Sequence, residues 1–264
     1  MRGTGMSGWA FSPLALLGRA LLHGLTQLGR AALMLAAALR WLARGRWELR
    51  ETLVQFNRIG VESIPIVLVT GLFSGMVLAY QTTRQLIGYG FADLAGGLVG
   101  LSMAREAAPV FTAIAAAGRV SAGIGAEIGT MAVTEQIDAL RVLATDPVRY
   151  LVVPRILAAC VALPGLTMFA NVIGSLGGYV VATGLGISGT TYITSLQRNV
   201  WVYDVVAGLV KAVIFGMIVA SVGCFRGLHA TGGADGVGRA TTGAVVTAIV
   251  LILVFNYFVN LVFF

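Results

Sequence analysis

The sequence is poor in charged residues and in the residue types that most often form metal or disulfide sites. Asp, Glu, Lys and Arg make up 11% of the 264 residues, whereas about one quarter is usual in a soluble domain. Lysine occurs once, and there are two histidines and two cysteines. These shortages exclude an ordinary soluble domain, a disulfide framework and a local His–Cys metal site.

The single lysine, Lys211, also excludes a Walker A loop, because that motif needs a Gly-Lys pair and Lys211 follows Val210. The glycine-rich run Arg226–Gly243 lacks the third glycine of a dinucleotide-binding fingerprint. We interpret it as a flexible cytoplasmic connector, with Thr241 or Thr242 starting the last helix. No His-Glu-x-x-His or Gly-x-Ser-x-Gly motif and no carboxylate pair in an apolar segment occurs. We therefore expect no catalytic residue, no metal site and no cofactor in this chain.

Long apolar segments dominate what remains, since hydrophobic residues make up 58% of the chain. A helix needs about 20 apolar residues to cross a bilayer. The arginine-rich residues 1–58 contain only shorter apolar patches, which predicts interfacial helices there. The predicted fold is an all-α polytopic membrane protein with a membrane domain over 59–264. Its five expected spans are 59–81, 97–120, 155–185, 205–225 and 243–264.

The basic residues are distributed unevenly about these spans. With the N-terminus in the cytoplasm, fourteen arginines lie on that side, counting Arg119 and Arg155 at the cytoplasmic ends of their approximate spans. Two lie on the opposite side, and Arg105 and Lys211 lie within spans. Positive residues accumulate in cytoplasmic loops. The distribution therefore predicts a cytoplasmic N-terminus and a C-terminus on the opposite side.

Four of the eleven acidic residues lie between Glu127 and Pro147, in a predicted cytoplasmic segment. Good helix formers and the restart at Asp146-Pro147 predict a cytoplasmic helix over about 123–145. An amphipathic helix with a solvated side is one interpretation. The other is a docking helix for a cytoplasmic partner, which the acidic charge favours because anionic headgroups repel it. Helical spacing places one polar stripe, flanked by Glu135, at Glu127, Met131, Thr134 and Asp138.

Three charged residues, Arg105, Glu106 and Lys211, fall inside predicted spans. Each costs about 2.5–3.5 kcal/mol at the centre of an inserted helix, so a partner or a wet cavity is expected. In one interpretation Arg105 and Glu106 lie near the outer membrane boundary, with Pro109 in the first turn. In the other, all three line one polar spot in an apolar chamber, where the two cations bind an anionic headgroup.

The run AEIGTMAVTEQIDALRVLATDPVRYLVVPR resembles the signature of the MlaE/YrbE permease family, the membrane subunits of ABC systems that move phospholipids with MCE-domain proteins. The segments SMAREAAPVFTAIAAAGRVSAGIGAEIG and VKAVIFG are similar to that family too, and the resemblance extends from about Phe56 onward. It implies a homodimeric, non-catalytic permease subunit of an ATP-driven phospholipid transporter in the bacterial inner membrane, with a periplasmic C-terminus. Such a transporter maintains outer-membrane lipid asymmetry or envelope lipid traffic.

The resemblance also implies partners and site residues. A cytoplasmic ABC ATPase dimer, which binds ATP and Mg²⁺, docks on the helix after the second span, and an MCE-domain hexamer sits above a lipid chamber. No nucleic acid is expected. The implied lipid-binding residues are Leu78, Tyr89, Arg105, Glu106 and Lys211. The implied ATPase-coupling residues are Glu127, Gly129, Met131, Thr134, Glu135 and Asp138. A secondary transporter, or a scaffold or enzyme acting on lipids without ATP, remains the alternative.

Overall fold

The computed structural model describes residues 13–45 and 48–263, and every long element in them is a helix. The α-helices are α1 (Pro13–Ala43), α2 (Leu49–Ile59), α3 (Ile64–Tyr89), α4 (Ala95–Ser102), α5 (Ala108–Ala116), α6 (Ala122–Val133), α7 (Gln136–Val142), α8 (Val153–Gly184), α9 (Gly189–Asn199), α10 (Val202–Leu228) and α11 (Gly233–Phe263). Short 3-10 turns are η1 (Val61–Ser63) and η2 (Ala92–Leu94). Three π-helical turns are η3 (Met103–Ala107), η4 (Ala117–Ser121) and η5 (Val148–Val152).

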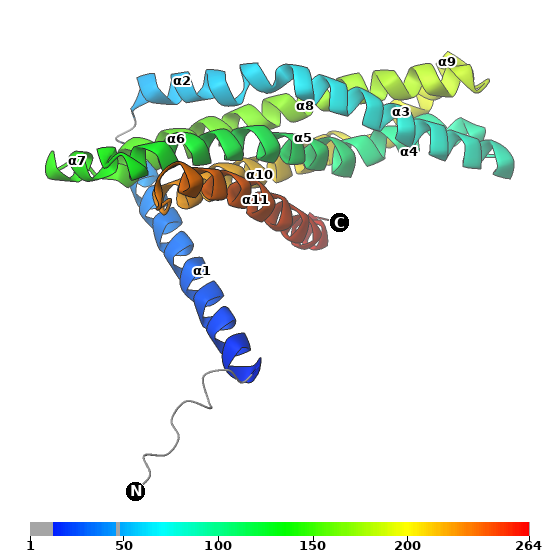
Figure 1. The fold of residues 1–264 in the computed structure, drawn as a ribbon. Coiled ribbons are helices and arrows are strands. Elements are labelled where there is room, and N and C mark those ends of the chain that lie inside the picture. The colour runs from blue at the N-terminus through cyan, green and yellow to red at the C-terminus, as the bar shows by residue number, and fades with distance from the viewer. Residues whose placement is uncertain (1–12, 46–47, 264) are drawn as a thin grey trace, which may run out of the picture.

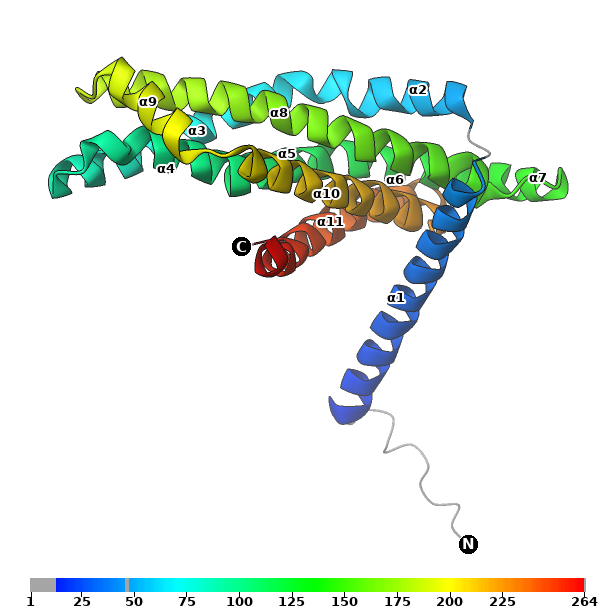
Figure 2. The ribbon, with the colours of Figure 1, turned by 180° about the vertical axis from the view of Figure 1, so that it is seen from behind.

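Within the described part of the chain, five helical segments are long and apolar enough to cross a membrane, which confirms the predicted fold class. They run alternately between two ends of the bundle (Figures 1 and 2). The start of α2, α7 and the α10–α11 turn lie at one end, and α4 and α9 lie at the other. The segments are Leu49–Tyr89, Ala92–Val133, Val148–Gly184, Val202–Leu228 and Gly233–Phe263.

Three helix boundaries differ from those expected from the sequence. α2, which was assigned to the interfacial region, continues through η1 into α3. The second segment extends through η4 and α6 to Val133, so it includes the start of the expected cytoplasmic helix. α11 begins at Gly233, so Thr241 and Thr242 lie inside it; their hydroxyls donate to Val237 O and Gly238 O, one turn back.

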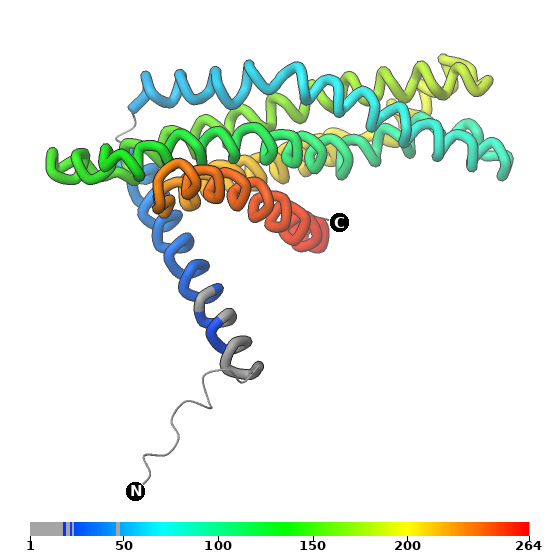
Figure 3. Tube along the Cα trace, viewed as in Figure 1, coloured from blue at the N-terminus to red at the C-terminus, as the bar shows by residue number. Residues whose placement is uncertain are grey.

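α1 leaves the bundle at an angle, and the end of α1 that leads toward α2 contacts the bundle (Figure 3). Met34 and Ala38 are buried against the core there, and the Trp41 indole N–H donates to Asp146 Oδ2 at 2.8 Å. Its outer turns expose leucines, including Leu22 and Leu25. The location of α1 in the membrane interface stays a prediction.

Small residues hold α3 and α8 in direct backbone contact. A Cβ atom added to Gly75 would lie 2.1 Å from the carbonyl oxygen of Gly174, and one added to Gly71 would lie 3.0 Å from Ala170 Cα. Small residues allow such close helix packing, which is a main source of stability between helices in a bilayer. Gly71 and Gly75 therefore lie at the packing surface between the first and third spans.

Candidate functional site

A π-helical turn and a glycine bring the charged residues of the second and fourth spans together. Arg105 and Glu106 lie in η3, where the extra residue of a π-turn redirects side chains. α10 crosses this turn at Gly208, where an added Cβ would lie 2.1 Å from Ala104 O. This close approach places Lys211, one turn further along α10, against the backbone of Arg105.

Lys211 is completely buried and is surrounded by oxygen atoms. Its ammonium donates to Glu106 Oε1 at 2.6 Å and to Arg105 O at 2.7 Å, and also to Asn260 Oδ1. Asn256 donates from Nδ2 to Glu106 Oε2 at 3.1 Å. The last span therefore completes a polar cluster at whose centre lies the Lys211–Glu106 ion pair.

Arg105 forms the second ion pair of this cluster. Its Nη2 lies 2.6 Å from Asp204 Oδ1, and its Nε donates to the same oxygen at 2.7 Å. Asp204 Oδ2 accepts a hydrogen bond from the backbone N–H of Trp201 at 2.8 Å, which caps the N-terminus of α10. One carboxylate thus fixes both the start of α10 and the guanidinium of Arg105.

The cluster borders a pocket of about 510 Å³. Arg105 and Glu106 are partly accessible, with 35% and 41% of their side-chain surface exposed. Apolar side chains from the second and last spans form much of the remaining wall, so the charged groups lie beside a surface that suits acyl chains. The lining residues are Leu101, Ser102, Arg105, Glu106, Tyr257, Asn260 and Leu261.

The predicted polar spot of Arg105, Glu106 and Lys211 is therefore present, but its charges are balanced. Each cation faces a carboxylate, Lys211 facing Glu106 and Arg105 facing Asp204. The sequence interpretation missed Asp204, Asn256 and Asn260. A signal existed in the last span, where two asparagines four residues apart face one side of an otherwise apolar helix.

The structure places the other two predicted lipid-binding residues outside this pocket. Leu78 is half-buried and packs against a core cluster that includes Val67, Val99 and Met103. Tyr89 is the last residue of α3 and is 76% exposed. Their assignment stays a prediction that the geometry of this chain does not support.

Replacing Asp204 by Asn is expected to destabilise the protein by about 1–3 kcal/mol, because the ion pair with Arg105 is lost and the hydrogen bond at the α10 N-terminus becomes a neutral one. Thermal unfolding of the detergent-solubilised protein measures the loss. Asp93→Asn is the matched control, since Asp93 is exposed near the same end of the bundle. Equal unfolding temperatures for both variants would contradict a positioning role for Asp204.

The expected single helix over 123–145 is two helices. α6 ends at Val133, and α7 starts after Glu135, whose backbone is left-handed with φ of 60°. Ala144 is left-handed too, with φ of 56°. Since such non-glycine conformations cost about 1–3 kcal/mol and cluster in functional segments, the two bends are a specific feature of this connection.

This break divides the predicted coupling stripe into an inward and an outward part. Glu127 faces the bundle, with Oε1 3.1 Å from Arg58 Nη1 and Oε2 3.1 Å from Arg155 Nη2. Gly129 is buried beside Ala230, and Met131 packs against the core. These residues connect helices to one another and do not form one exposed stripe with Asp138.

The outward part lies at and beyond the break. Thr134, Glu135 and Asp138 are exposed, and Asp138 accepts a hydrogen bond from Arg141 at 2.7 Å. Val142 and Leu143 are 86% and 74% exposed at the end of α7. An apolar pair beside acidic residues is typical of a protein-binding surface, and the sequence interpretation missed both apolar residues.

Fold and site together define a multi-pass α-helical membrane protein with ionisable residues in its interior, which in such proteins mark substrate pathways. The chain belongs to the MlaE permease family, whose description is "Permease MlaE" and which it matches over residues 52–262. It is a permease of an ABC-type transporter, a transport subunit that associates with an ATPase partner.

Several proteins that are named as permeases are similar to most of this chain. A probable ABC transporter permease protein of Synechocystis sp. is 47% identical over 83% of this chain and 84% of its own length. One of Rickettsia typhi is 45% identical over 76% of this chain and 78% of its own. The intermembrane phospholipid transport system permease protein MlaE of Haemophilus influenzae is 34% identical over 95% of this chain and 97% of its own length.

Proposed function

We propose that this chain is the membrane subunit of an ATP-driven phospholipid transporter in the bacterial inner membrane. One observation carries this proposal: a charged cluster inside an apolar bundle borders a pocket with apolar walls. That combination suits a molecule with a charged headgroup and hydrocarbon chains. A relative from Haemophilus influenzae with 34% identity is named as a phospholipid transport permease, which supports the same substrate class.

Within this proposal the headgroup phosphate competes with carboxylates for the cations. Lys211 is completely buried, whereas the Arg105 side chain is 35% exposed. Arg105 is therefore the cation that meets the phosphate first, and Asp204 holds it in place. Lys211 acts mainly on Glu106, whose carboxylate it keeps turned toward α10 and α11.

The proposed assembly contains two copies of this chain, a cytoplasmic ATPase dimer and an MCE-domain hexamer. The exposed surface of α7, with Glu135, Asp138, Val142 and Leu143, is the proposed ATPase-binding surface. ATP-driven closure of the ATPases pushes on α7, and α6 transmits the movement along the second span toward η3. Such coupling needs two discrete arrangements of the permease dimer.

Native purification followed by mass spectrometry of subunits and lipids tests the proposal. We expect an ATPase in equal amount and bound phospholipid. A chain that transports lipid without a nucleotide-binding subunit would instead support a secondary transporter. Turnover of bound lipid by the isolated chain would support an enzyme.

Replacing Glu135 by Lys is expected to lower the amount of co-purifying ATPase by about tenfold, because a reversed charge at a docking surface is strongly unfavourable. Phospholipid transport in proteoliposomes should fall in parallel. Asp93→Lys is the control, since Asp93 is exposed in η2, directly before α4, and α4 lies at the opposite end of the bundle from α7 (Figure 1). If Glu135→Lys leaves both ATPase binding and transport unchanged, α7 is not the docking surface.

A further inference from the structure

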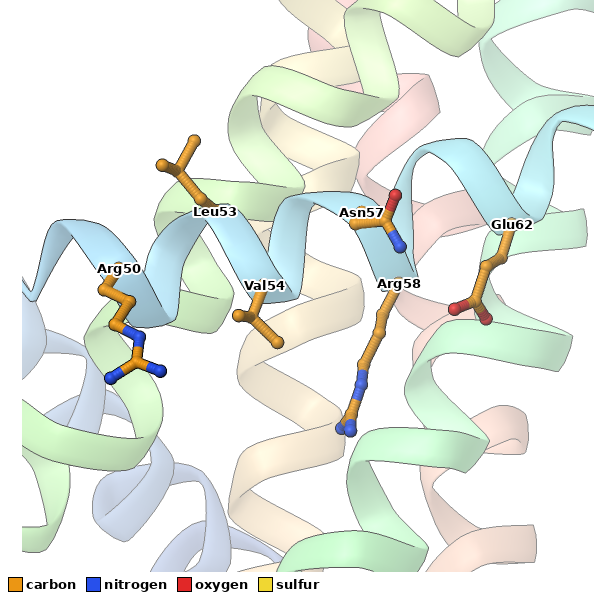
Figure 4. Close-up of a pocket in the computed structure, with 6 residues that line it drawn as sticks. All are labelled: Arg50, Leu53, Val54, Asn57, Arg58 and Glu62. Carbon is orange, nitrogen blue, oxygen red and sulfur yellow. The ribbon is translucent and has the colours of Figure 1, made fainter.

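A groove beside α2 and α6 lies apart from the Arg105–Lys211 cluster. It consists of two adjoining pockets of about 430 Å³ and 420 Å³, which share Arg58 and Glu62. The first follows one side of α2 and is shown in Figure 4; the second lies between α2 and the η4–α6 segment. This groove is at the arginine-rich end of the bundle, where the first spanning segment begins.

Basic side chains face the groove at regular helical spacing. Arg50, Val54, Arg58 and Glu62 project from the same side of α2 and η1 (Figure 4). Arg50 and Arg58 are two turns apart, about 12 Å along the axis, a separation that two extended arginine side chains bridge around one anion. Planar guanidinium groups bind phosphate oxygens with paired hydrogen bonds.

These arginines keep donors for a ligand. Arg58 uses Nη1 for Glu127, and its side chain is 54% exposed, so further N–H groups of its guanidinium remain accessible. Arg50 is exposed at the start of α2. Arg119, in contrast, is held in the groove wall: it pairs with Glu62 and donates from Nη1 to Arg58 O at 2.8 Å and to Ser63 Oγ at 2.9 Å.

Apolar side chains share the first pocket with the basic ones: Val54 projects between Arg50 and Arg58, and Leu53 projects from the opposite side of α2 (Figure 4). Leu53 and Val54 line the first pocket and are 68% and 42% exposed. Near a membrane boundary such side chains contact acyl chains, while arginines extend toward headgroups. A free phosphate ion would use the arginines alone, whereas a phospholipid matches both parts of the groove.

We propose that this groove is a second phospholipid-binding site. The phosphate lies between Arg50 and Arg58, and the acyl chains lie along Leu53 and Val54. Glu62 and Glu127 line the second pocket and face an amine or hydroxyl of the headgroup. The site goes beyond the proposed transport function, because its lipid comes from the leaflet at the arginine-rich end and does not enter the central pocket.

A lipid bound in this groove contacts a residue that also forms an ion pair between helices. Arg58 on α2 and Arg155 on α8 both pair with Glu127 on α6. A phosphate that binds Arg58 weakens the ion pair between Arg58 and Glu127. Lipid binding therefore changes the contact between α2 and α6. α6 leads directly to the two bends that flank α7.

Native mass spectrometry of the full chain in detergent tests the site, with dioleoylphosphatidylglycerol as the probe. Dioleoylglycerol has the same chains without the phosphate, and inorganic phosphate is the competitor. The double variant Arg50→Gln, Arg58→Lys keeps a cation beside Glu127, which preserves the helix contact. We expect it to lower phosphatidylglycerol affinity about tenfold and to leave dioleoylglycerol binding unchanged.

Arg30→Gln is the matched control, because Arg30 is an exposed arginine on α1 outside the groove. Adding Arg105→Gln removes the cation that meets the phosphate in the central pocket and leaves the groove residues unchanged, so failure of that pocket and failure of the groove are distinguished. Unchanged affinity in the double variant, or equal binding of both lipids, overturns the proposal. Complete displacement by millimolar inorganic phosphate, or a photo-crosslinker at Val54 that captures a second copy of the chain, overturns it too.

Discussion

Replacing Glu106 by Leu is expected to destabilise the protein by about 3–5 kcal/mol, because the ammonium of Lys211 then stays buried without its carboxylate. Lys211 is completely buried, so water does not replace the lost partner. Asn256 loses its acceptor as well. Unfolding of the detergent-solubilised protein by heat or by SDS measures the loss, and phospholipid transport in proteoliposomes is expected to disappear.

Removing the other partner of the ion pair, in Lys211→Met, is expected to destabilise the protein less. In Lys211→Met the residue left behind is Glu106, whose side chain is 41% exposed and is able to contact water. The double variant Glu106→Leu, Lys211→Met should recover part of the stability lost in Glu106→Leu, since no buried charge remains. Equal losses in the two single variants, or simple additivity in the double variant, would show that the ion pair does not carry this part of the fold.

The second large effect is expected from a single methyl group at Gly75. In Gly75→Ala the added Cβ lies 2.1 Å from the backbone oxygen of Gly174, so α3 and α8 must separate. Forcing atoms into a packed interface costs about 1–3 kcal/mol when side chains adjust. Here a backbone atom must move, and a loss at or above the upper end of that range is expected.

Gly88→Ala on the same helix is the control, because an added Cβ there meets nothing within 4 Å. That variant should be neutral or slightly stabilising, since Ala is the better helix former. The two variants are compared by unfolding temperature and by the yield of folded protein after membrane extraction. Equal behaviour would mean that the α3–α8 contact relaxes without cost.

Features with a strong local signal were predictable from the sequence. The length and hydropathy of the spans predicted all five long segments. A common polar spot was one of two interpretations of the intramembrane charges Arg105, Glu106 and Lys211, and it has a physical basis. Isolated ions in hydrocarbon are costly, so residues from distant spans are expected to meet.

Features that depend on tertiary contacts were not predictable in the same way. Helix propensity gives no signal for a break at Glu135, because its left-handed backbone is uncommon for a non-glycine residue. The extension of the second span through η4 and α6 was hidden by Arg119 and Glu127, whose charges indicated the cytoplasmic side of the membrane. Their partners Glu62, Arg58 and Arg155 lie far away in the sequence, and these ion pairs make helical burial of the charges possible.

The contact of Gly75 with Gly174 also restricts how the bundle moves. With backbone against backbone and no side chains between them, α3 and α8 neither slide past each other nor rotate about their axes at this level. Together with the contact of Gly71 with Ala170, this limits relative motion of the two helices to bending on either side of the contacts. Spreading the helices at one end of the bundle therefore leaves their packing at this level, and beyond it, unchanged.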